Sequence, residues 1–290
     1  MALIGRAVAD SEQSDGIMAV LVLYGRSPMT AASWPTLLEW LQGATPPLRH
    51  CLIYDNSPDP TAGAALLPNR TSLVWEPENR GTASAYQTAA AIAVRHGCDR
   101  LLLLDQDTAL PADYLALAAV AANAAPQSAA LLPRVYHGMH LVSPAIITAW
   151  GSVRATANPV CEQGITTAIS SGAIVRCDEI AKISFPVAIW LDYVDHWMFH
   201  KIANGSSSIG LINVDLPHDL SVRTPESLSP ARVRTILAAE DAFYRVLRRS
   251  ARVVLPVRRV LRAFRYAVAG RLDLAGIVLR AVIAKTAARL

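Results

Sequence analysis

The chain has 290 residues, of which 52% are hydrophobic and 17% are charged. This composition excludes an intrinsically disordered protein and suits one large domain with or without an appendage. No zinc-binding spacing or small disulfide framework is visible among Cys51, Cys98, Cys161 and Cys177, so we expect a reducing, cytoplasmic setting. The first sixteen residues, expected to be flexible, lack the apolar core of a signal peptide, and no apolar run is long enough to span a bilayer.

The net charge of +4 conceals a strong asymmetry. Residues 232–290 hold 14 Lys and Arg against 3 Asp and Glu, a net charge of about +11, whereas the rest of the chain carries about −7. Ser, Pro and Glu cluster from Pro225 to Pro230, which predicts a boundary there. We therefore expect a flexible segment over 1–16, a main domain over 17–225 and a basic helical tail over 226–290.

The main domain begins with strands that alternate with helices. Apolar runs predict buried strands over 17–24, 51–54, 72–75 and 101–104, and the spacing predicts helices over 31–41 and 82–96. This alternation indicates parallel crossover connections and a doubly wound α/β sheet, with its site at the carboxyl ends of the strands. The chain contains neither a G-x-G-x-x-G fingerprint nor a Walker loop, which argues against a dinucleotide oxidoreductase and a P-loop NTPase.

Polar residues follow three of these strands. Four consecutive leucines lead directly into Asp105 and Asp107, while Asp55 and Asn79 follow two other strands. Two neighbouring carboxylates repel each other unless a cation neutralises them, and hard oxygen ligands suit Mg or Mn with a diphosphate completing the shell. The alternative for the Asp105–Asp107 pair is a solvated turn, because a bare Asp-x-Asp is a weak motif.

These segments resemble the inverting GT-A glycosyltransferases of family 2. The matching motifs are Asp55-Asn56-Ser57 after a strand, Asn79-x-Gly81 before a helix, and Asp105-Gln106-Asp107, whose Asp-Gln-Asp form resembles the rhamnosyltransferase branch. The likeness covers roughly residues 17–222. It implies a GT-A, Rossmann-like and mostly parallel sheet flanked by helices, with a nucleotide-sugar half over 17–110 and an acceptor half over 111–225.

The second half extends the resemblance. Ser170-Ser171-Gly172 is similar to a Ser-Gly strand on the family's acceptor side, and Asp192-Tyr193-Val194-Asp195 is similar to another of its segments. His218 stands where the family has a metal-binding histidine. Gln87, His196 and Lys201 depart from the usual residues, and these departures concern the donor and acceptor rather than the metal site.

The resemblance implies a role for each matching residue. Asp107, Asp105 and His218 are expected to bind a Mg or Mn ion, and Asp195 to act as the base, with Asp192 beside it. If that segment is helical, Asp192 and Asp195 share one face, and the neighbouring carboxylate raises the pKa of Asp195. The expected donor-binding residues are Tyr24, Asp55, Asn79, Gly81, Asp105 and Gln106, and the expected acceptor-side residues are Ser171, Gly172, Trp190 and Trp197.

Plainer alternatives stay open for several of these residues. Asp195 also suits a helix cap or a surface position, and His218 an ordinary loop. Asp55 and Asn79 also suit turn-capping positions. Both tryptophans, Trp190 and Trp197, suit a buried core as well as an apolar wall for a sugar or lipid.

The basic tail predicts amphipathic helices. Val257, Val260, Leu261, Phe264 and Val268 keep helical spacing, with Arg258, Arg259, Arg262 and Arg265 mostly on the opposing side. A second segment combines Leu272, Ile277, Val278 and Val282 with Arg271, Arg280, Lys285 and Arg289. Such helices are typical of peripheral binding to an anionic membrane surface. The alternatives are packing on the catalytic domain and a homo-oligomer contact; no recognition motif supports nucleic-acid binding.

The expected function is transfer of a sugar from a nucleotide-diphosphate donor to a glycan or lipid-linked glycan. The resemblance favours dTDP-L-rhamnose as the donor, with a UDP-sugar as runner-up, in bacterial surface polysaccharide synthesis at the inner face of the cell membrane. The alternatives are a UDP-hexose transferase of the same fold and a non-enzymatic scaffold protein with a nucleotide-sugar fold.

Overall fold

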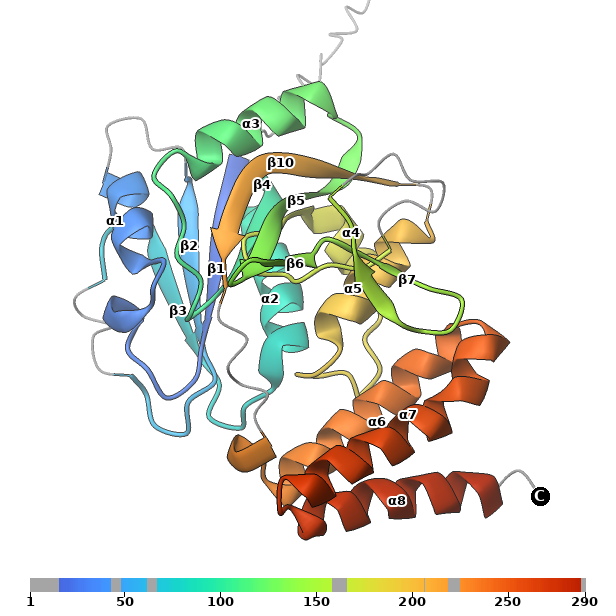
Figure 1. Ribbon diagram of the computed structural model, residues 1–290. Coiled ribbons are helices and arrows are strands. Elements are labelled where there is room, and N and C mark those ends of the chain that lie inside the picture. Colours follow the sequence, from blue (N-terminus) through green and yellow to red (C-terminus); the bar gives the residue numbers. More distant parts are fainter. Residues whose placement is uncertain are drawn as a thin grey trace, which may run out of the picture.

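The computed structural model describes residues 16–42, 48–61, 67–157, 166–205, 207–218 and 225–287 (Figure 1). The segment 1–15, predicted to be flexible, and Cys161 lie outside these residues. The described part is a mixed α/β fold with a mainly parallel central sheet flanked by helices, which confirms the predicted fold class.

The central sheet has the strand order β10-β5-β9-β4-β1-β2-β3. Its strands are β1 (Gly16–Leu23), β2 (His50–Asp55), β3 (Thr71–Trp75), β4 (Cys98–Asp105), β5 (Ser128–His137), β9 (Ile174–Arg176) and β10 (Ser208–Pro217). Neighbouring strands in this order are parallel except at β9, which runs antiparallel to both β4 and β5. At the side, β6 (His140–Ser143) pairs with β5, and β7 (Ala145–Ile147) pairs with β8 (Val153–Ala155) in a small second sheet.

Helices cover both faces of the sheet. On one face lie α1 (Trp34–Gln42), which follows the short 3-10 turn η1 (Pro28–Thr30), and α3 (Tyr114–Ala124). On the other lie α2 (Gly81–Arg95), α4 (Cys177–Lys182) and α5 (Val194–Ala203). The described cysteines, Cys51, Cys98 and Cys177, are buried as free thiols.

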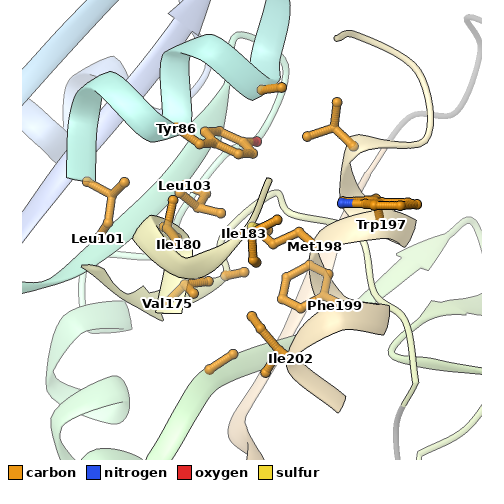
Figure 2. Close-up of a cluster of buried hydrophobic side chains, with 14 of the residues drawn as sticks. Tyr86, Leu101, Leu103, Val175, Ile180, Ile183, Trp197, Met198, Phe199 and Ile202 are labelled. Carbon is orange, nitrogen blue, oxygen red and sulfur yellow. The ribbon is translucent and has the colours of Figure 1, made fainter. Parts of the chain in front are cut away.

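The leucines of β4 are divided between the two faces. Leu101 and Leu103 pack with residues of α2, α4 and α5 (Figure 2), whereas Leu102 and Leu104 pack with residues of α1 and α3. All four are at most 1% exposed, and burying one leucine contributes about 1.5–3 kcal/mol. Because successive side chains of a strand point to opposite faces, a strand covered on both sides is apolar throughout. The predicted fully buried strand is therefore confirmed.

The reversed strand β9 determines which residues lie at the carboxyl edge of the sheet beside β4. Since β9 runs against β4, its beginning lies where β4 ends. Gly172 N donates to Leu103 O at 2.9 Å, and Leu103 N donates to Ala173 O at 2.8 Å. Gly172 has φ +80°, and a Cβ there would meet Leu216 Cδ1 at 2.7 Å, so the turn requires glycine. This turn brings the preceding serines to the end of β4.

The tail forms three helices, α6 (Pro230–Val246), α7 (Arg249–Val268) and α8 (Leu272–Ala287), which lie as a layer beside the sheet domain (Figure 1). Ser229 begins α6, since its side chain accepts a hydrogen bond from Arg232 N at 3.1 Å and Pro230 occupies the first turn. Phe243 and Leu255 join the main core on the α2 face, and Leu274 and Val278 of α8 join a separate cluster with residues of α6 and α7.

The arginine side of α7 faces the protein. Arg259 is 1% exposed and its Nε lies 2.8 Å from Glu240 Oε2, while Arg262 Nη2 lies 2.6 Å from Glu240 Oε1. Arg258 Nη1 donates to Gly151 O at 2.8 Å. The expectation that these three arginines attract lipid is therefore wrong, because they are held by protein carboxylates and carbonyls. No helix in the described ranges is long and apolar enough to cross a bilayer.

Candidate active site

Asp105 connects the two halves of the chain at the carboxyl end of β4. Its Oδ2 accepts a hydrogen bond from Ser171 Oγ at 2.6 Å, which reaches it across the turn before β9. Its Oδ1 accepts from the Thr108 hydroxyl and, at 3.3 Å, from Asp107 N. The predicted donor-side carboxylate and acceptor-side serine are thus in direct contact.

The loop after β1 reaches the same place. Arg26 Nη1 lies 2.8 Å from Asp107 Oδ1, and both side chains are substantially exposed. Tyr24 N donates to Gln106 Oε1 at 3.1 Å. The structure therefore brings the predicted residues Tyr24, Gln106 and Asp107 together, and it adds Arg26, which the sequence analysis missed.

Asp55 ends β2 and is fully buried. Its carboxylate accepts hydrogen bonds from Ser57 N at 3.0 Å, Thr61 N at 3.0 Å and Thr61 Oγ1 at 2.7 Å. Burial alone would raise the pKa of Asp55, but these hydrogen bonds outweigh it and lower the pKa. The arrangement favours the turn-capping alternative for Asp55, since these bonds order the loop that follows β2.

The start of α2 contacts the segment around Trp190, which was expected on the acceptor side. Gly81 N donates to Asn56 Oδ1 at 3.2 Å, and Ala83 N donates to Trp190 O at 3.1 Å. Gly81 has φ +74°, and a Cβ there would meet Trp190 O at 2.3 Å, so only glycine permits this approach. Asn79 adopts φ +50° and donates its own N–H to Glu76 O at 3.0 Å, forming the turn before the helix.

Asp195 lies in the first turn of α5 and is half-buried. Its Oδ2 accepts a hydrogen bond from Ser170 N at 3.2 Å, and the Tyr86 hydroxyl donates to Ser170 Oγ at 2.8 Å. Burial raises the pKa of the Asp195 carboxyl and the charge of Asp105 adds to this, whereas the bonds from Ser170 and the imidazole of His218 lower it. The net effect is a raised pKa, which suits a proton acceptor.

Asp192 is not on the same helical face as Asp195. The helix α5 begins at Val194, after Tyr193 in the left-handed conformation with φ +63°, so Asp192 precedes the helix. Its Oδ1 lies 2.8 Å from Arg232 Nη2 of α6. Asp192 and Asp195 were expected to share one face only if the segment was helical, and Asp192 lies outside the helix. The neighbouring carboxylate that raises the pKa of Asp195 is Asp105.

His218 follows β10, and its backbone N–H donates to Tyr136 O at 2.8 Å. Its ring Nδ1 is buried and has no hydrogen-bond partner among the described residues. A buried imidazole nitrogen without such a partner is available to bind a metal ion or a water molecule. A positive charge on the His218 imidazole would lower the pKa of Asp195, so the two side chains lie close enough to interact.

A divalent cation fits this donor set in part. Asp107 offers an exposed carboxylate and His218 an unpaired nitrogen, both of which are suitable ligands. In the parts of the chain that the structure covers, however, no three His, Cys, Asp or Glu side chains gather into a ready-made metal site. Asp105, Asp107 and His218 are thus not a preassembled triad, and oxygen atoms from a bound diphosphate would have to complete the shell.

The two tryptophans have different surroundings. Trp197 is 6% exposed, packs in the core beside Met198 and Ile183 (Figure 2), and donates its indole N–H to Ser184 O at 3.0 Å. This favours the core alternative for Trp197. Trp190 is half-buried and contacts the start of α2 through its carbonyl.

No protein-family model and no curated protein matches the chain. Among solved structures, it is similar to GalNAc-T7 in complex with UDP, GalNAc and Mn²⁺, with a TM-score of 0.55 and 9% identity. The fold is GT-A. The likeness covers 79% of this chain and 50% of that structure, so the chain spans half of its length.

Sequence reasoning missed Arg26, Tyr86 and the role of Ser170 at this site. Arg26 could have been found from the sequence, because it comes two residues after Tyr24 in the loop after a predicted strand. The carboxyl end of that strand was expected to lie near Asp105 and Asp107. Tyr86 had a weaker signal, as the single Phe, Tyr or Trp residue in an alanine-rich helix, five residues after Gly81. Ser170 belongs to the Ser170-Ser171-Gly172 motif, but its contact with Asp195 depends on the reversed direction of β9.

Proposed function

We propose that this chain is an inverting glycosyltransferase that uses a nucleotide-diphosphate sugar and Asp195 as its base. The observation that carries the proposal is the placement of two carboxylates at adjacent serines: Asp195 accepts a hydrogen bond from Ser170, and Asp105, at the end of β4, accepts one from Ser171. Burial, which raises the pKa of the Asp195 carboxyl, adds support. A GT-A fold and the complex of GalNAc-T7 with UDP, GalNAc and Mn²⁺ support a donor of this class.

Inverting transfer is a single displacement at the anomeric carbon of the donor. The acceptor hydroxyl oxygen attacks the anomeric carbon and gives its proton to Asp195. The nucleoside diphosphate departs from the opposite side of the same carbon. A carboxylate with a raised pKa is the stronger base for this step. Ser170 holds one carboxylate oxygen in place, and Tyr86 in turn holds the Ser170 hydroxyl.

A divalent cation, when bound, neutralises the charge of the departing diphosphate. Asp107 and His218 would hold it, with Asp105 close to the donor. Arg26 would turn from Asp107 toward the diphosphate, since an exposed ion pair contributes only about 0–1 kcal/mol and opens at little cost. Mg and Mn are both compatible with these ligands.

The finer assignment concerns the donor and acceptor. The Asp105-Gln106-Asp107 motif favours dTDP-L-rhamnose, with a UDP-sugar as runner-up, and a glycan or lipid-linked glycan of a bacterial surface polysaccharide as the acceptor. Calorimetry with dTDP-L-rhamnose, UDP-glucose and UDP-galactose in the presence of Mg tests the donor. Tighter binding of either UDP-sugar would reject rhamnose and keep the broader activity.

The decisive experiment compares Asp195→Asn with Asp192→Asn. The two variants make the same chemical change, but Asp192 is ion-paired to Arg232, whereas Asp195 accepts a hydrogen bond from Ser170. Turnover should fall by roughly 10²–10⁴ in Asp195→Asn with donor affinity largely kept, and by far less in Asp192→Asn. A dead Asp192→Asn beside a near-normal Asp195→Asn would show that the base is misassigned. If the wild-type chain binds no nucleotide sugar with Mg or Mn, the activity is excluded.

A further inference from the structure

Helix α7 exposes an apolar face. Six large hydrophobic residues, between 46% and 72% exposed, follow helical spacing along it: Val253, Val257, Val260, Leu261, Phe264 and Val268. At 100° per residue they fall within a stripe roughly 100° wide. We call these six residues the α7 stripe. Soluble proteins rarely leave such a continuous apolar strip in water unless it contacts a partner.

The stripe lies opposite the side by which α7 is attached. Ala251, Leu255, Arg259 and Ala263 are buried and form the attached side. Arg259 is fixed there by ion pairs to Glu240 and Asp241. The usual arrangement of a surface helix, with its charges in water and its apolar face on the core, is thus inverted. Rotating α7 to hide the stripe would break these buried ion pairs, so the stripe stays outward.

Positive charge surrounds the stripe. Arg249 and Arg265 are exposed and, at 100° per residue, project just beyond its two edges, and Arg248 and Arg252 are exposed close to the start of the helix. The carboxylates of Glu240, Asp241 and Asp273, within the described part of α6–α8, are each ion-paired to an arginine. The exposed charge around the stripe is therefore mainly positive.

We propose that the α7 stripe is a docking surface for an anionic lipid membrane. An apolar helical face between arginines inserts at the headgroup boundary, where the hydrophobic effect and attraction to anionic headgroups act together. A second copy of the chain fits this surface poorly, because a twofold pairing of stripes would bring the flanking arginines toward each other. Nucleic acid would satisfy the charges but leave the stripe in water.

The test is co-sedimentation of the full chain with phosphatidylcholine vesicles, with or without phosphatidylglycerol, at low and high salt. The wild-type chain should sediment with the phosphatidylglycerol vesicles and should bind more weakly as salt rises. The double variant Val257→Glu/Phe264→Glu should lower the partition coefficient by roughly tenfold or more, because it removes apolar area and adds negative charge.

The matched control is Val94→Glu/Val120→Glu. These valines are 65% and 68% exposed on α2 and α3, so the control makes the same charge change at equally exposed sites away from α7. It should sediment nearly as the wild type does. A second variant, Arg249→Gln/Arg265→Gln, should reduce the preference for phosphatidylglycerol without removing the stripe.

Three results would overturn the proposal. The wild-type chain could stay in the supernatant under all conditions, or the control could lose binding as fully as the α7 variant. The third is a wild-type dimer in sedimentation velocity that Val257→Glu/Phe264→Glu dissociates, since the stripe would then be covered by a second copy. None of these measurements depends on sugar transfer, so failure here leaves the proposed activity intact.

Discussion

Arg26 Nη1 lies 2.8 Å from Asp107 Oδ1, so the guanidinium of the loop after β1 contacts the carboxylate expected to bind metal. The contact joins two loops at the carboxyl edge of the sheet and partly neutralises Asp107. A cation that binds Asp107 competes with Arg26 for this carboxylate, so we expect metal binding and the position of this arginine to be coupled.

Replacing Arg26 with Gln should strengthen Mn²⁺ binding in the absence of donor. The pair is exposed and contributes at most about 1 kcal/mol, so the affinity should rise by no more than about fivefold. Titration calorimetry with Mn²⁺ measures this, and Asp107→Asn should weaken binding in the same assay. An unchanged affinity in Arg26→Gln together with a normal affinity in Asp107→Asn would place the metal elsewhere.

Replacing Ser170 with Ala should shift the pH profile of catalysis. The hydrogen bonds from Ser170 lower the pKa of Asp195, so loss of the side chain should raise that pKa further. Because the base must be deprotonated, the acid side of the pH profile of kcat/KM should move to higher pH. At high pH, where Asp195 is deprotonated, the variant should recover much of the wild-type kcat/KM. If Ser170 had only a structural role, the variant would instead have a lower maximum kcat/KM and an unshifted acid side.

The raised pKa of Asp195 also predicts a cost in stability. Its charged form is disfavoured in the folded state, so the folded chain binds the proton more tightly than the unfolded chain does. Stability is then lost as pH rises from the ordinary carboxyl range, about pH 4, through the folded pKa. Asp195→Asn should melt higher than the wild type at neutral pH and equally below pH 4. A lower melting temperature at neutral pH would contradict this.

The buried pair of Glu240 and Arg259 should respond asymmetrically to substitution. Glu240→Ala leaves Arg259 with only part of its ion pairing in a buried position, which should cost about 3–5 kcal/mol of unfolding free energy. Arg259→Met leaves Glu240 paired with Arg262 and should cost less. Urea denaturation of both variants gives the comparison, and the reverse order would show that Arg262 does not compensate.

The parts of the fold that follow from local patterns were readable in the sequence. The leucines of β4 predicted a strand buried on both faces, and the alternation of strands and helices predicted the mainly parallel sheet. The reversed direction of β9 was not readable, because Ile174–Arg176 is a three-residue strand and its pairing depends on β4 and β5. The contact between Ser171 and Asp105 follows from this reversal.

Side-chain partners far apart in the sequence were the hardest to foresee. Helical spacing correctly separated the apolar residues of α7 from most of its arginines, but periodicity does not say which side meets the protein. Glu240 and Asp241 decide that, since they offer Arg259 buried partners. Likewise, the separation of Asp192 from Asp195 depends on the left-handed conformation of Tyr193, which spacing alone does not reveal.

The strand β4 joins two parts of the sheet, since it pairs with β1 on one side and with β9 on the other. The pairing of β4 with β9 is made by backbone hydrogen bonds, which place few restrictions on side-chain identity. The side chains across this join are far more restricted: Leu101 and Leu103 pack with residues of α4 and α5, and Gly81 and Tyr86 of α2 contact Trp190 and Ser170. Any exchange of the segment after Thr108 must therefore preserve these contacts as well as the ladder, so we expect substitutions on the two sides of β4 to be energetically coupled.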